Sequence, residues 1–278
     1  MHSLRVVLAS FTMLAAGGSA MAQFAQAPAP KSAPKPEMTE GCPGMISYRQ
    51  PRIIPAALGS DEVRITYIGH STFLLESPKL VRIGTDYNDY VKPPVLPDVI
   101  TMNHAHSSHY TDRPDPSIPH VLRGWAEEFG KPVRHDAQIR DVRVRTVPTN
   151  IRTYGGEGTE RHGNSIFIYE MGNLCIAHLG HLHHTLTQQQ LNEIGRVDVV
   201  MFPVDGTYTL DLDGMIEVLT SLKAQVMIPM HYFSSFTLDR FLSRVRDTFD
   251  VQTNDTPSVV LSKASLPAKP QILVLPGR

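Results

Sequence analysis

The chain of 278 residues has little cysteine, no excess of either charge and only one long apolar run. Two cysteines, Cys42 and Cys175, cannot form a disulfide framework; they could form one bridge, or Cys175 could remain a buried thiol. Its 26 lysines and arginines against 27 acidic residues leave a formal charge of −1, so no general basic excess is available to hold nucleic acid. We therefore expect no nucleic-acid partner, and no stable membrane insertion.

The one long apolar run lies at the N-terminus. Arg5 precedes apolar residues 6–16, and Ala20-Met21-Ala22 has the small-residue pattern of a signal-peptide cleavage site. The run is too short to span a bilayer. The pattern predicts a signal peptide over residues 1–22, cleaved near Ala22, and hence a periplasmic or secreted protein, with an uncleaved anchor as the alternative. Residues 23–40 are rich in alanine, proline and lysine, which predicts an extended linker.

Hydrophobic patterning becomes regular from Asp61 onward. Alternating or wholly apolar segments predict strands at residues 63–68, 71–76, 99–102, 174–177, 197–204 and 226–230. Apolar stripes at helical spacing follow N-cap candidates at Thr187, at Asp211 or Asp213, and at Thr237. Strands come first and strand–helix alternation follows, which predicts a single layered α/β domain over residues 41–278, with two sheets covered by helices.

Histidine is unusually frequent, with 13 in the chain, and many of these residues follow apolar strands. Three lie in residues 104–109, four lie in residues 178–184, and His231 ends a further strand. We expect all three groups on loops at one edge of the sheets, where sites commonly lie. Neutral imidazole binds zinc, copper, iron and nickel, so this pattern favours a metal site over chance clustering on solvated loops. The chain has no Cys-x-x-Cys-His or Gly-x-Ser-x-Gly motif, which disfavours haem attachment and serine-based catalysis.

The chain resembles the metallo-β-lactamase superfamily, in particular the metal-dependent hydrolases similar to ascorbate-phosphate lactonase and N-acyl-phosphatidylethanolamine phospholipase D. The similar blocks are residues 67–73 (YIGHSTF), 84–86 (GTD), 104–109 (HAHSSH), 162–167 (HGNSIF), 178–184 (HLGHLHH), 202–209 (FPVDGTYT) and 228–232 (IPMHY). This resemblance spans about Asp61 to the C-terminus. It implies a four-layer αββα sandwich with a metal site between the two sheets, and a structural role for Asp86.

Several positions depart from the family's motifs. Ser108 replaces an aspartate, His181 replaces the aspartate that bridges two metals, and no histidine occurs near Ile151 where one is expected. His183 and Asp205 stand where the family prefers glycine. Two of these changes remove a carboxylate, which should make bound water more acidic and the site more attractive to anions. They also leave open whether one ion or two are bound.

The resemblance implies a metal site built from five histidines, with three further candidates. The five are His104, His106, His109, His181 and His231, and the further candidates, which the sequence does not rank, are His70, His178 and His184. His104, His106 and His181 could form a three-histidine site with water as the fourth ligand, while His109 and His231 could hold a second ion. Asp205 and His181 are the candidates for orienting the attacking water.

These observations predict an exported metal-dependent hydrolase. Metal-bound hydroxide would attack an ester, lactone, amide or phosphodiester in a small-molecule, anionic substrate. Zinc is the expected divalent ion, with copper, manganese and iron as alternatives. A different class of function is also open: a periplasmic metal-binding protein of the copper type, or a catalytically degenerate protein on the same fold, because the chain gains histidines as it loses aspartates.

Overall fold

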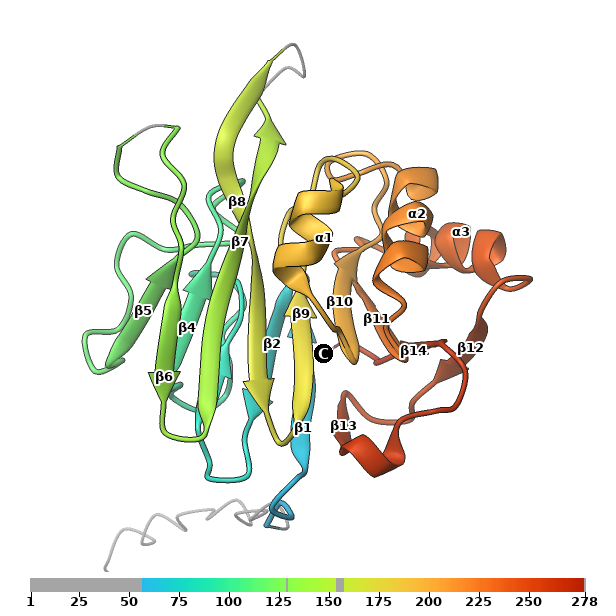
Figure 1. Ribbon diagram of the computed structural model, residues 1–278, viewed down its shortest axis with the longest axis horizontal. Coiled ribbons are helices and arrows are strands. Elements are labelled where there is room, and N and C mark those ends of the chain that lie inside the picture. Colours follow the sequence, from blue (N-terminus) through green and yellow to red (C-terminus); the bar gives the residue numbers. More distant parts are fainter. Residues whose placement is uncertain (1–56, 129, 154–157, 278) are drawn as a thin grey trace, which may run out of the picture. The chain divides into compact units, whose positions relative to one another are not determined.

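The structure is a computed structural model that describes residues 57–128, 130–153 and 158–277, and they build two β-sheets (Figure 1). In spatial order, the six-stranded sheet contains β13 (Ser258–Leu261), β1 (Val63–Gly69), β2 (Thr72–Glu76), β3 (Arg82–Gly84), β4 (Val99–Met102) and β5 (His120–Arg123). The eight-stranded sheet contains β12 (Asp250–Thr253), β14 (Gln271–Val274), β11 (Val226–Met230), β10 (Val199–Pro203), β9 (Leu174–His178), β8 (Thr159–Met171), β7 (Val142–Arg152) and β6 (Asp136–Ile139). The predicted signal peptide, linker and Cys42 lie outside the described residues.

Three helices cover the outer face of the eight-stranded sheet, beside its strands β9 to β11 (Figure 1). They are α1 (Gln188–Ile194), α2 (Leu212–Leu222) and α3 (Ser235–Val245), and a short 3-10 turn spans Lys263–Ser265. Thr187 forms the predicted capping box with Gln190, and Asp211 caps α2. The predicted start of α3 at Thr237 is wrong: Ser234 is the N-cap, because its extended backbone lets its hydroxyl accept from the Thr237 amide.

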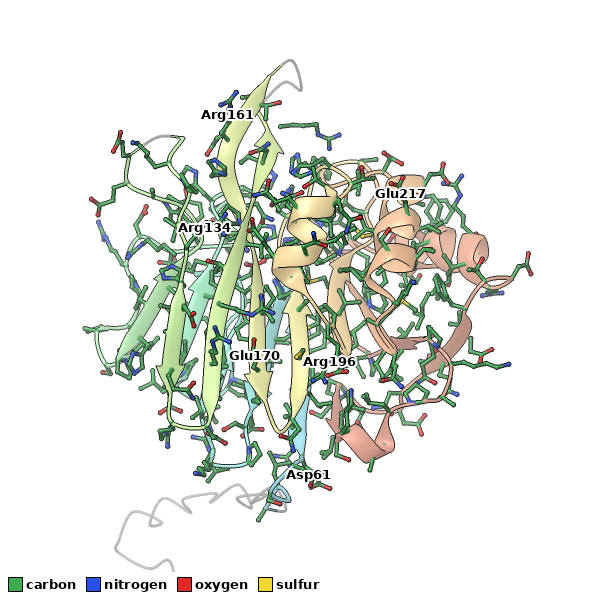
Figure 2. The ribbon with its side chains drawn as sticks, viewed as in Figure 1. Asp61, Arg134, Arg161, Glu170, Arg196 and Glu217 are labelled. Atoms are coloured by element: carbon green, nitrogen blue, oxygen red, sulfur yellow. The ribbon has the colours of Figure 1, made fainter. Side chains whose placement is uncertain are left out.

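Two apolar cores hold these layers together. Between the sheets, inward-facing residues of β1 and β2 such as Phe73 pack against residues of β8 to β11 such as Phe167 and Met201. Outside the eight-stranded sheet, Phe202 on β10 packs against Phe241 on α3, with ring centroids 5.3 Å apart. Because successive side chains point to opposite faces of a strand, strands of the eight-stranded sheet such as β8 and β10 contribute residues to both cores. Charged side chains, among them Glu170 near the end of β8, lie at the surface (Figure 2).

The predicted α/β class and the sandwich of two sheets with helices are confirmed. In the described part of the chain the outer layer on the six-stranded sheet consists of loops, where Tyr87 and Ile118 pack against Ile100 and Met102 of β4. None of the helices formed by the described residues is both long and apolar enough to cross a bilayer.

Strand direction decides where the histidine-rich loops meet. Strands β9, β10 and β11 are parallel neighbours, so the loops that follow them leave the same edge of the eight-stranded sheet. In the six-stranded sheet, β3 and β4 are also parallel, and the loop of residues 103–109 follows β4. The turn between β1 and β2 adds His70, whose backbone carbonyl accepts from the His231 amide at 2.7 Å. Both sheets thus contribute loops to one site.

Candidate metal centre

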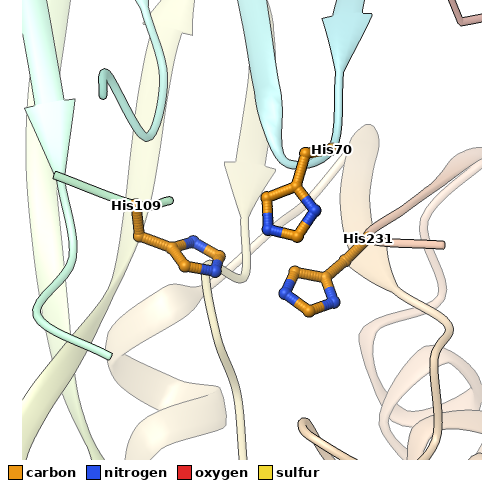
Figure 3. A group of neighbouring side chains, drawn as sticks. All are labelled: His70, His109 and His231. Carbon is orange, nitrogen blue, oxygen red and sulfur yellow. The ribbon is translucent and has the colours of Figure 1, made fainter. Parts of the chain in front are cut away.

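Five imidazole rings gather at this shared edge. Three of them, His70, His109 and His231, offer ring nitrogens that all lie within 4.8 Å of one another (Figure 3). His181 stands beside this group, with its ring centroid 4.9 Å from that of His109 and 5.0 Å from that of His231. The His106 ring is 4.7 Å from that of His181 and lies on the exposed side. The structure therefore brings together four of the five residues expected as ligands, and adds His70.

The ring of His109 is held in one orientation by a buried carboxylate. Its Nδ1 lies 2.6 Å from Asp86 Oδ2, and both side chains are fully buried. A carboxylate accepts, so Nδ1 carries the proton and Nε2 keeps its lone pair. That Nε2 is buried and has no hydrogen-bond partner among the described residues. Although burial opposes the shift, His109 and His178 lower the pKa of Asp86, which keeps the carboxylate ionised.

His231 has a similar environment. Its Nδ1 lies 2.9 Å from Asp205 Oδ2 without the alignment of a hydrogen bond, and both side chains are almost fully buried. The Asp205 carboxylate also accepts from the Thr207, Tyr208 and Thr209 amides and from the Thr207 and Thr209 hydroxyls. These donors and His231 lower the pKa of Asp205, although burial alone would raise it. The Asp205 carboxylate favours a proton on Nδ1, so Nε2 offers a second unpartnered, buried lone pair.

His70 occupies the turn after β1 with a positive φ of 52°. Its Nε2 lies 3.1 Å from the hydroxyl of Ser108, the residue that replaces an aspartate of the family motif. Its ring centroid is 4.1 Å from that of His231. Burial, followed by the neighbouring His231 and His109, lowers the pKa of His70 to about 3, so the imidazole is neutral at ordinary pH.

The residues of this group fit a metal ion. A cation needs neutral imidazoles with lone pairs that converge, and buried nitrogens without partners are costly unless something binds them. Burial lowers the pKa of His109 despite the adjacent carboxylate, so it too is neutral. His70, His109 and His231 therefore form a candidate three-histidine position, and the sequence had left His70 unranked.

Three histidines considered as metal ligands from the sequence, His104, His178 and His184, contact other groups instead. The His104 ring lies beside Trp125 and Tyr110, at centroid distances of 5.0 and 5.5 Å, and its Nδ1 lies 3.2 Å from Glu160 Oε1. Both nitrogens of His178 are engaged, one by the Ser71 carbonyl and the other by the Gly180 amide. Both nitrogens of His184 are likewise engaged, by the Asn150 amide and the Thr185 carbonyl. Metal binding by these three remains a prediction without support from their positions.

His181 enters the cluster through a constrained loop. Gly180 precedes it with a φ of +58°, and a Cβ there would collide with the side chains of Asn103 and Asn164. The amide of His181 donates to Asn164 Oδ1 at 2.8 Å. Its Nδ1 lies 2.5 Å from Nε2 of His183, and its own Nε2 is buried without a partner among the described residues. Burial and the surrounding histidines hold the pKa of His181 well below 6.5.

Two hollows adjoin the cluster. One, of about 320 Å³, is lined by His70, His106, Ser108, Tyr208, His231 and Phe233. The other, of about 720 Å³, reaches His183 and Arg152 and shares His106 and Tyr208 with the first. Tyr208 and Phe233 are exposed and in edge-to-face contact, with ring centroids 5.7 Å apart. Neither aromatic residue could be assigned to the site from the sequence, because only the folded chain places them beside the histidines.

Comparison with known proteins agrees with this arrangement. A family model described as the beta-lactamase superfamily domain matches residues 64–231, which is over half of the chain and includes every clustered histidine. The chain belongs to the metallo-β-lactamase superfamily. The resemblance stated from the sequence blocks is thereby confirmed.

Individual relatives in this superfamily are distant but span most of the described chain. A UPF0173 metal-dependent hydrolase of Thermoplasma acidophilum is 28% identical over 200 residues, covering 65% of this chain and 87% of that protein. One from Archaeoglobus fulgidus is 27% identical over 195 residues, covering 61% and 83%. A Thermotoga maritima crystal structure, described as a candidate zinc-dependent hydrolase of the metallo-β-lactamase superfamily, aligns with a TM-score of 0.55 at 29% identity, covering 78% of this chain and all of that one.

Proposed function

We propose that the protein is an exported, zinc-dependent hydrolase of esters, lactones, amides or phosphodiesters. The observation that carries the proposal is the convergence of His70, His109 and His231 at the edge where both sheets end. Two of these rings are backed by the carboxylates of Asp86 and Asp205, an arrangement that fixes the tautomer of a metal-binding histidine. The names of the relatives, which are metal-dependent hydrolases, support the same reaction class.

We assign roles to the chain's own residues as follows. His70, His109 and His231 would hold a divalent ion, which when bound lowers the pKa of water and polarises the bond to be cleaved. The carboxylate of Asp205 already accepts from five donors of its own loop, so we assign it to orienting His231 rather than the attacking water. His106, exposed and shared by both hollows, is placed to contact the substrate.

The substrate proposal rests on the walls of the two hollows. Tyr208 and Phe233 offer an apolar surface beside the candidate metal position. Arg152 lines the larger hollow and bears a positive charge, although its Nη2 already donates to three backbone carbonyls. An organic anion with an apolar group next to the scissile bond matches both surfaces.

Hydrolysis is tested with a panel of ester, lactone, amide and phosphodiester substrates on zinc-loaded protein and on a His231→Ala variant. We expect turnover of at least one class by the wild type and a loss of more than about 100-fold in the variant, since even residues that only orient a ligand contribute 10–100-fold. Equal rates for both proteins would contradict the proposal. His120→Ala is the matched control, because His120 is exposed on β5 and lines neither hollow.

A second candidate function is metal binding without hydrolysis. It is favoured by the composition of the cluster. The three candidate ligands are all imidazoles, a ligand set that copper also accepts. Elemental analysis of protein purified without added metal separates the two. Tightly held copper with no turnover on the panel favours the binder, and zinc with turnover favours the hydrolase.

Export is proposed from the N-terminal pattern alone. We expect the mature protein to begin at Gln23 and to appear in the periplasmic or secreted fraction. N-terminal sequencing and cell fractionation test this directly. A chain that retains Met1 and stays with the membranes would indicate an uncleaved anchor.

A further inference from the structure

Resting on the function proposed above, we propose that His181 is a hydrogen-bond donor to the substrate and not a metal ligand. Its Nε2–H would face the substrate oxygen that gains negative charge during hydrolysis. A carboxylate at this position would accept a hydrogen bond or bind metal, so the replacement of aspartate by histidine reverses the polarity of the side chain. The inference follows from a chain of hydrogen bonds that leaves His181 with one tautomer.

The first link of this chain is a backbone amide. The Arg152 N–H donates to Nδ1 of His183 at 2.9 Å. An amide N–H can only donate, so Nδ1 of His183 must present a lone pair. An imidazolium has no lone pair on either nitrogen, so His183 is neutral and its single proton is on Nε2. The tautomer of His183 is therefore set by the backbone amide of Arg152 in β7, because this amide can only donate.

The second link is the contact between the two histidines. Nε2 of His183 lies 2.5 Å from Nδ1 of His181. Since the proton of His183 is on Nε2, His183 donates and Nδ1 of His181 accepts. Neutral His181 then carries its own proton on Nε2. For Nε2 to bind a metal instead, the proton would have to move to Nδ1, where it would meet the proton of His183.

The third observation is where this proton lies. The side chain of His181 is fully buried, and its Nε2 has no hydrogen-bond partner in the part of the chain that the structure describes. The ring stands almost perpendicular to those of His109 and His231, at interplanar angles of 88° and 83°. A buried N–H without a partner is unfavourable, so the site is built for an acceptor that arrives with the ligand.

His109 and His231 show the opposite arrangement. Each has its Nδ1 within 3 Å of a carboxylate oxygen, of Asp86 and Asp205 respectively, and each therefore presents a lone pair toward the centre. His181 differs because another histidine, a donor, backs its Nδ1. The same residue type thus serves as ligand or donor according to what lies behind the ring.

The role of the donor is electrostatic. His181 keeps its proton, because losing it would leave an imidazolate in a buried position. A preorganised donor aimed at a developing oxyanion typically contributes about 10²–10³-fold to kcat. His183 acts through His181 and is a positioning residue. By donating a hydrogen bond to Nδ1 of His181, it keeps the proton of His181 on Nε2.

The tautomer can be measured without any turnover. Long-range ¹H–¹⁵N spectra of the wild-type protein distinguish Nδ1–H, Nε2–H and metal-bound imidazole nitrogens. We expect His181 to be the Nε2–H tautomer before and after one equivalent of zinc, and Nε2 of His109 and His231 to shift on metal binding. A proton on Nδ1 of His181, or a zinc-induced shift at its Nε2, would overturn the proposal.

Variants test the role. His181→Phe, whose ring carries no N–H, should keep the zinc content of the wild type and the KM while kcat falls about 10²–10³-fold. His183→Ala should release the tautomer of His181 and lower kcat, and His183→Gln, whose amide N–H can replace Nε2–H, should restore part of it. Loss of zinc in His181→Phe, or an unchanged kcat, contradicts the proposal. If the wild type hydrolyses nothing on the panel, the proposed function fails separately, while the spectra and zinc content still decide the state of His181.

Discussion

The Nε2 atom of His70 lies 3.1 Å from the Oγ atom of Ser108, and this contact joins the β1–β2 turn to the loop after β4. Ser108 stands where the superfamily's motif has an aspartate, and His70 lies in the first-hairpin block that resembles the family. A small hydroxyl leaves room for the imidazole ring, which brings its second nitrogen to the group that includes His109 and His231. The β1–β2 turn thus contributes a ring nitrogen to the candidate metal position.

Removing the Ser108 hydroxyl should weaken metal binding without abolishing it. In Ser108→Ala the His70 ring loses the partner that holds its orientation, so we expect zinc affinity to fall about 10–100-fold. Competition with a chromophoric chelator measures this affinity. Ser107→Ala is the matched control, because Ser107 is exposed and should leave the affinity unchanged. An affinity equal to that of the wild type in Ser108→Ala would show that His70 is not held by this contact.

Single histidine-to-alanine variants should separate ligands from bystanders. We expect His70→Ala, His109→Ala and His231→Ala each to lose more than about 100-fold in zinc affinity, since each removes a converging lone pair. His104→Ala should bind zinc as the wild type does, because its ring contacts Trp125 and its Nδ1 faces Glu160. Zinc content after gel filtration is the measurement. Loss of zinc from His104→Ala would show that His104 is a metal ligand, as the sequence motif predicts.

Asp86 should matter through His109. Asp86→Asn replaces a buried acceptor that lies 2.6 Å from His109 Nδ1 by a group whose amide can point its own protons at the ring. We expect zinc affinity to fall about 10–100-fold and the metal-free protein to be less stable. Chelator competition and thermal unfolding report the two effects. Asp255→Asn, which alters an exposed carboxylate in the turn between β12 and β13, provides the control for stability. An unchanged zinc affinity in Asp86→Asn would show that the Asp86 carboxylate does not contribute to metal binding.

The metal-free protein should lose stability as the solution becomes mildly acidic. The pKa values of His70 and His183 are lowered from 6.5 to about 3 and about 4, mainly by burial, and those of His109 and His181 are also lowered. Below pH 6.5 the histidines of the unfolded chain bind protons that those of the folded chain do not. The free energy of unfolding therefore decreases as the pH is lowered. The pKa values of the Asp86 and Asp205 carboxyls are also lowered in the folded protein. These two groups reduce the free energy of unfolding only when the pH is below their ordinary pKa of 3.8.

Thermal unfolding between pH 7 and 4.5 in the presence of a chelator therefore isolates the histidines. We expect a Tm that falls steadily over this range, and a shallower slope in His70→Gln, which removes one of the buried imidazoles. A Tm that stays constant over the range would show that the cluster takes up protons in the folded protein as readily as in the unfolded chain.

Much of the fold could be predicted because it depends on local pattern. The alternation of residues 63–68, the apolar run 226–230 and the capping box at Thr187 each follow from neighbouring residues, and each appears in the structure. The superfamily could also be identified, since the blocks that carry it are short and contiguous. The start of α3 was placed three residues late because Ser234 and Thr237 are both acceptable N-caps, and backbone geometry decides between them.

The composition of the site was only partly accessible from the sequence. The histidines of residues 104–109 and 178–184, together with His231, mark the loops, because these residues follow apolar strands whose ends meet. Which of their nitrogens are free is a different matter. His104 has turned toward Trp125, and His178 and His184 use both nitrogens in backbone contacts, facts that depend on partners far away in the chain.

The amino-acid sequence by itself thus determined the two-sheet architecture, the superfamily and the edge at which the imidazoles collect, since hydrophobic periodicity and short motifs are local properties. Only the tertiary structure decided that His70 joins His109 and His231, and that His183 stands behind His181. Ligand and donor states depend on the lone pair or proton that a distant residue places at each ring, and such contacts exist only once the chain has folded.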